Sequence, residues 1–407
     1  MALGFDDVLV GTWTHPEGHT GCTVVLPPKG SMGACAIRGG APGTREAAAL
    51  GPDGQGTECH AVFLSGGSAF GLAVGDGIAE WCEQQGRGYD RFVTPVPVVA
   101  GAIVFDLRQS GAARPDAKSG WDACQAATNH DPPMGRVGVG AGCTVAKVAG
   151  FEHLKAGGQG WAVHSGGGVT VGAIMAVNAL GNVLAEDGTM LAGVDTDDAY
   201  PFRDMAPPPR TNTVIGCLVT DAVLSKGQAS RAVDLAHTGI ARTIDPAHTI
   251  HDGDALFLLT SQRTQVPAPV DLVATLGARA VTDAIRASVR AAADGPPLMP
   301  PTRLQTHDPA DPRRRPMSSP PPGDVPDGLE DYPYAIVGAE KRIKTMATLL
   351  SVVSLAMLVA GLYLALFTPR VGLGGLLTLV GFVVLMVVPF VAKRMRNTAL
   401  ARERQET

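Results

Sequence analysis

A threonine at the boundary between a loop and a strand carries the first chemical possibility in this sequence. The segment from Pro207 to Ala222 reads PPPRTNTVIGCLVTDA, so Thr213 opens a strongly β-prone run. A threonine hydroxyl is a weak nucleophile unless a base lies beside it. If the bond between Asn212 and Thr213 is broken, the new α-amine, with a pKa near 7.7–8.0, can act as that base. The ordinary alternative is a threonine that simply begins a strand.

Two carboxylates precede another apolar run, HDGDALFLLT, which extends from His251 to Thr260. Asp252 and Asp254 are separated by a glycine that permits a tight turn. Carboxylates spaced in this way at the beginning of a strand can orient an ammonium group or share a proton. A polar turn before a strand is the alternative interpretation.

A third candidate lies in the glycine-rich segment GRVGVGAGCTVAKVAG, Gly135 to Gly150. No convincing helix follows the glycines, so they do not predict a phosphate-binding loop. Lys147 is a candidate hydrogen-bond donor to an oxyanion if it is partly buried, because burial readily lowers the pKa of a lysine. An ordinary exposed lysine is the alternative. No pattern predicts a metal site or a cofactor.

Composition limits the class of protein. The chain has 407 residues, a net charge of −5 and only 17% charged residues, so no nucleic-acid partner is expected. The seven cysteines are scattered and form no CxxC motif, which favours a reducing compartment over a disulfide framework. The first residues, MALGFDDVLVG, lack the basic and apolar regions of a signal peptide.

Strand-like and helical patterns alternate up to about residue 295, which predicts a layered domain of sheets covered by helices. Phe70, Val74, Ile78 and Trp81 are spaced as one face of a helix, and so are Val233, Ala236 and Ile240. A last helix is expected over Val273 to Val289. The expected strands are Thr23–Leu26, Ala61–Leu64, Val98–Phe105, Val169–Val177, Val214–Thr220 and Ala255–Thr260.

The remainder of the chain is predicted to be a linker and a membrane anchor. Residues 296–340 form a proline-rich linker, with 12 prolines between Pro296 and Pro333. Within residues 341–407, the segments 346–367 and 371–392 are uncharged and long enough to cross a bilayer of about 30 Å. Basic residues flank this pair on both outer sides, which predicts that both ends are cytoplasmic. We therefore expect residues 1–295 to lie at the cytoplasmic side of the cell membrane.

Seven segments, in this order along the chain, resemble the self-cleaving N-terminal-nucleophile (Ntn) aminopeptidases. This family includes D-aminopeptidase, β-peptidyl aminopeptidases and the nylon-oligomer hydrolase. The resemblance covers about residues 6–295, and RGGAPGTRE together with the asparagine–threonine junction is its most specific part. The segments are TGCTVVL, RGGAPGTRE, LSGGSAFGL, GAGCTVAK, GQGWA, NTVIGCLVTDA and HDGDALF.

The resemblance implies a fold, a cleavage site and a set of active-site residues. The fold would be a four-layer αββα sandwich of the α+β class, and cleaved heterodimers would associate into larger oligomers. Thr213 would be the nucleophile and Asn212–Thr213 the bond that cleaves itself. Lys147 and Asn178 would assist at the carbonyl or hold the hydroxyl, and Asp252 and Asp254 would lie near the nucleophile's amine. The chain departs from the nylon-oligomer hydrolase where Phe105 stands in place of an expected tyrosine.

These inferences predict a membrane-tethered peptidase or amidase that matures by cutting itself into chains 1–212 and 213–407. Its substrates would be short peptides or peptide-like amides. An acyltransferase of related fold, which passes the acyl group to an amine, remains an alternative. So does an anchored binding domain without turnover.

Overall fold

The structure is a computed structural model. It describes residues 1–293 except 56–57, 90–92, 108–111, 151–152, 195–210 and 265–266. These residues belong to the first of two compact units, Met1–His307 and Asp308–Thr407. The predicted linker (296–340) and the predicted membrane helices (346–367 and 371–392) lie outside the described residues. Within the described part, no helix has the length and hydropathy needed to cross a membrane.

Two five-stranded sheets form the centre of the fold. The first has the strand order β1-β2-β5-β6-β4 and the second the order β3-β15-β13-β10-β9. In the first sheet the strands are β1 (Leu9–Thr14), β2 (Gly21–Leu26), β4 (Thr44–Arg45), β5 (Ala61–Ser65) and β6 (Val99–Ile103). In the second they are β3 (Met32–Ile37), β9 (Gly158–Gly166), β10 (Val169–Asn178), β13 (Thr213–Thr220) and β15 (Ala255–Thr260).

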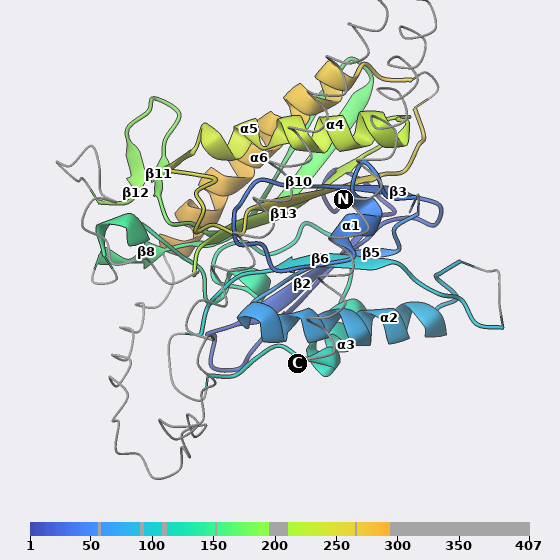
Figure 1. The fold of residues 1–407 in the computed structure, drawn as a ribbon, viewed down its shortest axis with the longest axis horizontal. Helices are drawn as coiled ribbons and strands as arrows, with labels where there is room; N and C mark the ends of the chain where they lie inside the picture. Colours follow the sequence, from blue (N-terminus) through green and yellow to red (C-terminus); the bar gives the residue numbers. More distant parts are fainter. Residues whose placement is uncertain are drawn as a thin grey trace, which may run out of the picture. The chain divides into compact units, whose positions relative to one another are not determined.

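Helices cover the outer face of each sheet, so the layers follow the order helix, sheet, sheet, helix (Figure 1). On the first sheet lie α2 (Val74–Gln84) and α3 (Ala117–Gln125), and on the second lie α4 (Lys226–Ala236), α5 (Thr238–Ala241) and α6 (Val270–Ala293). The predicted α+β class is therefore confirmed. The short elements are α1 (Ala47–Leu50), η1 (Ser68–Ala73), η2 (Gly138–Gly140), η3 (Lys147–Ala149), β7 (Thr144–Val145), β8 (Lys155–Ala156), β11 (Asn182–Leu184), β12 (Met190–Ala192) and β14 (Ile244–Asp245).

Strand β13 separates two of the three apolar cores, and its sequence explains why. Every residue of β13 is buried. Val214 and Leu218 pack in the core beneath α4 and α6, whereas Ile215 and Val219 pack in the core between the two sheets. Successive strand side chains point to opposite faces, so a strand buried on both faces must be apolar at nearly every position. This confirms the strand that the run after Thr213 predicts.

The helical face predicted for Phe70, Val74, Ile78 and Trp81 is wrong at its beginning. Phe70 lies in the 3-10 helix η1, and the α-helix begins only at Val74. A 3-10 helix has about three residues per turn, so Phe70 does not continue the stripe of the α-helix. The Phe70 side chain is 55% exposed, and the guanidinium of Arg114 lies 3.6 Å from the centre of its ring.

The directions of three strands bring their ends to one edge of the second sheet. β13 runs parallel to β15 and antiparallel to β10. The first residue of β13 therefore lies beside the last residue of β10, and β15 begins next to β13 on its other side. In register, Asn178 pairs with Thr213 and Ala255 pairs with Ile215. This edge is where the predicted chemical groups meet.

Candidate active site

The Asn212–Thr213 bond lies at this edge, buried from solvent. Asn212 is 2% and Thr213 is 6% exposed. The Thr213 hydroxyl donates a hydrogen bond to the carbonyl oxygen of Asn212. The backbone N–H of Gly253 donates to the same oxygen at 2.9 Å. The hydroxyl and a backbone donor therefore meet at one carbonyl, that of the residue preceding the threonine.

Position 253 has no room for a side chain, so it must be a glycine. A Cβ atom at this position would lie 2.8 Å from Thr213 Oγ1 and 3.1 Å from the carbonyl oxygen of Ala41. Proteins essentially never place another heavy atom within 3.0 Å of a Cβ, so a side chain at this position would force a neighbour to move. The absent side chain thus leaves the space in which the threonine hydroxyl lies.

Asn178 connects three segments of the site through its side-chain amide. Its Oδ1 accepts a hydrogen bond from the Thr144 N–H at 3.0 Å. Its Nδ2 donates to the carbonyl oxygens of Phe105 and Thr211, each at 3.0 Å. Since Asn178 is fully buried, these bonds satisfy groups that water cannot reach. Phe105, the position at which a tyrosine was expected, thus enters the site through its backbone carbonyl.

Lys147 is buried, which excludes the exposed-lysine interpretation. It is 5% exposed and begins η3, directly after Ala146 in the left-handed backbone region. Its Nζ donates to the carbonyl oxygen of Asn178 at 2.6 Å, to Asn178 Oδ1 at 2.8 Å and to the carbonyl oxygen of Thr144 at 3.0 Å. A buried ammonium group requires such acceptors to offset its lost hydration.

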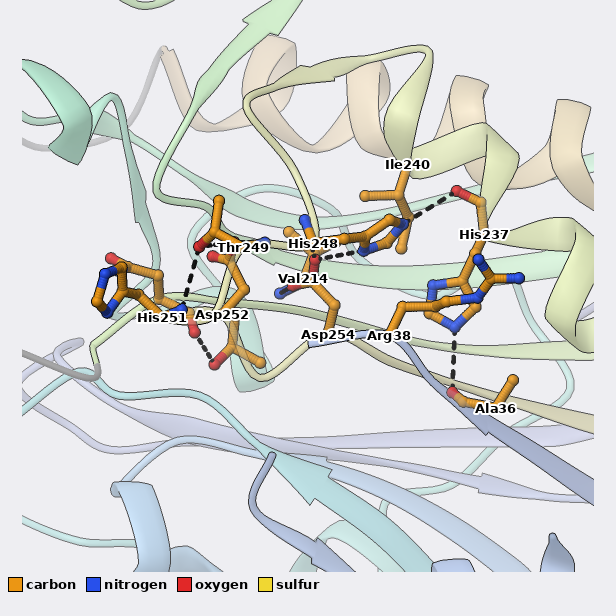
Figure 2. Close-up of polar contacts among 12 residues, drawn as sticks. Ala36, Arg38, Val214, His237, Ile240, His248, Thr249, His251, Asp252 and Asp254 are labelled. Carbon is orange, nitrogen blue, oxygen red and sulfur yellow. Dashed lines mark hydrogen bonds and ion pairs between the residues drawn. The ribbon is translucent and has the colours of Figure 1, made fainter. Parts of the chain in front are cut away.

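The two predicted aspartates are also buried, and they bond to different partners (Figure 2). Asp252 Oδ2 accepts from the N–H of Thr249 at 2.8 Å and from its hydroxyl at 2.6 Å. Asp254 Oδ1 accepts from the Val214 N–H at 2.7 Å, and Asp254 Oδ2 accepts from His248 Nδ1 at 2.8 Å. Asp254 therefore holds the backbone of the residue that follows Thr213.

The surroundings of Asp252 change the pH at which it loses its proton. Burial, followed by the negative charge of Asp254, raises the pKa of Asp252 from 3.8 to about 6. The hydrogen bonds from Thr249 and the positive charge of Lys147 lower this pKa but do not outweigh the burial. Asp252 can therefore exchange a proton near neutral pH, as a general acid or base must.

The structure brings together every predicted site residue: Asn212, Thr213, Lys147, Asn178, Asp252 and Asp254. Sequence reasoning missed the donor Gly253 N–H as well as Thr249 and His248, which hold the two aspartates. No metal-binding group of three or more His, Cys, Asp or Glu side chains occurs among the described residues.

Comparison with protein families gives one match that covers most of the chain: residues 5–295 match the model of peptidase family S58. An uncharacterized aminopeptidase of Mycobacterium tuberculosis is 40% identical over 293 residues, which are 67% of this chain and 82% of that protein. A 6-aminohexanoate-oligomer endohydrolase of Paenarthrobacter ureafaciens is 29% identical, with 66% of this chain and 76% of that protein covered.

Solved structures of the same fold include two aminopeptidases. The L-aminopeptidase D-Ala-esterase/amidase of Ochrobactrum anthropi, described as a variant of the Ntn hydrolase fold, has a TM-score of 0.53 and 19% identity. The match covers 71% of this chain and 85% of that one. The β-aminopeptidase of a Burkholderia species has a TM-score of 0.51 and 19% identity, with 70% and 84% covered. At this identity the likeness shows the fold alone.

Proposed function

This chain belongs to peptidase family S58 and is a hydrolase of the Ntn type, and from this premise we propose that Thr213 cleaves the chain and then hydrolyses amide substrates. In this proposal the precursor breaks between Asn212 and Thr213. The liberated threonine is the nucleophile of the mature enzyme.

One observation carries the proposal: two hydrogen-bond donors converge on the Asn212 carbonyl oxygen. They are the Thr213 hydroxyl and the Gly253 N–H, the latter at 2.9 Å. The hydroxyl therefore lies beside the carbonyl that it would attack. A preorganised N–H at an oxyanion is worth about 3–4 kcal/mol of transition-state stabilisation.

In the cleavage step, Thr213 Oγ1 attacks the carbonyl carbon of Asn212. The hydroxyl proton is transferred to the Thr213 nitrogen as the C–N bond breaks, which leaves an ester between Asn212 and the threonine oxygen. Water then hydrolyses this ester to give a carboxylate on Asn212 and a free hydroxyl on Thr213. The Gly253 N–H stabilises the oxyanion, and Lys147 and Asn178 fix the surrounding backbone through their hydrogen bonds.

Turnover repeats this chemistry on a substrate amide. The free α-amine of Thr213 takes the hydroxyl proton as the oxygen attacks the substrate carbonyl. The same amine then donates a proton to the leaving nitrogen, and water hydrolyses the acyl-enzyme. Asp254 bonds to the N–H of Val214, the residue after Thr213, and Asp252 pairs with Asn212, the residue before it. In this proposal the two carboxylates balance the charge of the amine.

Short peptides and ω-amino-acid oligomers are the proposed substrates. The names of the relatives in Mycobacterium and Paenarthrobacter, an aminopeptidase and a 6-aminohexanoate-oligomer endohydrolase, support amide bonds as the class. Both kinds of substrate contain an amide carbonyl that the Thr213 hydroxyl can attack. They differ in the number of carbon atoms between the amine and the carbonyl.

The test is an activity assay of purified wild type, Thr213→Ala and Thr213→Ser. Amino-acid p-nitroanilides and 6-aminohexanoate oligomers serve as substrates, with and without an added acceptor amine. We expect activity in wild type, reduced activity in the serine variant and none in the alanine variant. Activity in the alanine variant would contradict the proposal, and a product that contains the acceptor amine would favour the acyltransferase.

For the C-terminal region we propose a membrane anchor formed by residues 346–367 and 371–392, with the enzyme domain on the cytoplasmic side. The support is the uncharged length of both segments and the basic residues outside the pair. Resistance of the full chain to carbonate extraction tests the anchor. Sedimentation in detergent tests the proposed association of cleaved heterodimers into larger oligomers.

A further inference from the structure

The buried Asp254 carboxylate forms an ion pair with the half-buried His248, next to the residue that follows the proposed nucleophile. Asp254 is 1% exposed. Its Oδ2 accepts hydrogen bonds from His248 twice, from Nδ1 at 2.8 Å and from the backbone N–H at 3.1 Å. Its other oxygen accepts from the Val214 N–H at 2.7 Å (Figure 2). The carboxylate therefore links the loop that carries His248 to Val214, the second residue of β13.

The second ring nitrogen of His248 also faces an acceptor. His248 Nε2 lies 3.4 Å from the carbonyl oxygen of His237. The two imidazole rings meet edge to face, with centroids 5.0 Å apart and an interplanar angle of 63°. Since one nitrogen faces a carboxylate and the other a carbonyl, the doubly protonated ring is the form that both neighbours favour.

We propose that His248, as an imidazolium, is a positioning residue that pairs with the Asp254 carboxylate and fixes it against the Val214 N–H, so that Asp252 is the carboxylate that exchanges a proton. This inference rests on the proposed function of Thr213. His248 acts on turnover only through Asp254.

The charges that surround His248 agree with this arrangement. Burial lowers the pKa of His248, but the hydrogen bond and charge of Asp254 outweigh burial and leave the pKa above its usual 6.5. Arg38 opposes the imidazolium and is itself paired with Asp234. The neighbouring His237 stays neutral, because burial lowers its pKa to about 4.

Removal of the imidazolium should make Asp252 harder to ionise. Without it, Asp254 loses its contacting positive charge, so the site becomes more negative and Asp252 holds its proton to a higher pH. The α-amine of Thr213 is affected in the same direction, because the site becomes more negative. The pH below which the rate falls therefore rises, whether Asp252 or the α-amine of Thr213 determines this fall.

The first measurement is the pH dependence of kcat and KM for His248→Gln, which keeps a hydrogen-bond donor but cannot carry charge. We expect the acidic limb of kcat/KM to move upward by about one unit, at the low end of the 1–3 units typical of an opposite charge in contact. At pH 5 the loss should approach tenfold and should lie in kcat. The matched control is His130→Gln, which alters an exposed histidine and should reproduce the wild-type profile.

The second measurement is independent of activity and of the folding of a His248 variant. Nuclear magnetic resonance follows the His248 ring through a pH titration in Thr213→Ala, and in the same chain with Asp254→Asn. We expect His248 to titrate above 6.5 in the first chain and at a lower pH in the second.

The outcomes separate the two proposals. An unchanged acidic limb in His248→Gln, or a His248 titration below 6.5 in Thr213→Ala, overturns the positioning role. Activity in Thr213→Ala overturns the proposed function instead, and it leaves the measured titration of His248 intact.

Discussion

Asn178 and Thr213 form the last pair of the ladder between β10 and β13, at the edge where the chain is proposed to break. The Asn178 side chain donates to the Thr211 carbonyl oxygen at 3.0 Å, two residues before the threonine. One residue thus holds the backbone on both sides of Asn212. This arrangement explains why a buried amide, rather than an apolar residue, ends β10.

Replacing Asn178 should therefore disorder the junction. Asn178→Ala removes two donated and three accepted hydrogen bonds in a buried site, and the unsatisfied groups should destabilise the protein by about 3 kcal/mol. Self-cleavage should slow together with the loss of stability. Denaturant unfolding and the fraction cleaved over time measure the two effects. Asn129→Ala, which removes only one exposed hydrogen bond, to the carbonyl oxygen of Asp6, should change both far less, and equal stabilities for both variants would contradict the role of Asn178.

Gly253→Ala should block cleavage while the fold is retained. The added methyl would lie 2.8 Å from Thr213 Oγ1, so either the hydroxyl or the Gly253 N–H must move. Loss of one oxyanion donor typically costs about 100-fold or more in rate. The control is Gly227→Ala, where a Cβ meets nothing within 4 Å. Full processing of the Gly253 variant would show that this close approach does not matter.

Lys147→Met should impair processing and also alter the pH dependence of turnover. The change leaves the carbonyl oxygens of Thr144 and Asn178 without the Nζ donor, which should slow processing. It also removes a positive charge that lowers the pKa of Asp252, so the pH above which substrate hydrolysis becomes efficient should rise. Rates of processing and of hydrolysis between pH 5 and pH 8 test the two effects. Lys155→Met, at an exposed lysine, serves as the control, and identical pH profiles would contradict the prediction.

Asp252→Asn should stabilise the fold above pH 6 even though it impairs function. The folded chain raises the pKa of Asp252 from 3.8 to about 6, so ionised Asp252 destabilises the native state as pH rises through this window. The asparagine cannot ionise, and its gain should reach at most about 3 kcal/mol at pH 8 and vanish below pH 4. Unfolding in the uncleaved Thr213→Ala background measures it, with the exposed Asp53→Asn as control. A stability difference independent of pH would contradict the shift.

The main elements could be predicted because their side-chain patterns are strong. β13 and β15 are apolar at almost every position, as strands buried on both faces must be. By contrast, β3 (MGACAI) and β9 (GQGWAVHSG) were not predicted, because their small and polar residues interrupt the run of large apolar residues that indicates a buried strand. Their place in the sheet depends on tertiary packing, which outweighs local preference.

The candidate residues could be identified from their family motifs, but their mutual contacts could not. Thr213 and Asp252 are separated by 39 residues, and only the parallel pairing of β13 and β15 brings them together. His248 was missed for a different reason. His248 lies in a loop, and its own backbone is in the left-handed region (φ 57°). In this conformation its ring contacts Asp254. No hydrophobic periodicity indicates a loop conformation of this kind.

The most direct test of the account is intact mass spectrometry of purified wild type beside Thr213→Ala, with the N-terminus of each polypeptide sequenced. For wild type we predict two polypeptides, residues 1–212 and residues 213–407, the second of 407 − 212 = 195 residues and beginning with threonine. For Thr213→Ala it predicts a single chain of 407 residues. An active wild-type protein that remains unbroken, or whose second polypeptide begins at another residue, would contradict it.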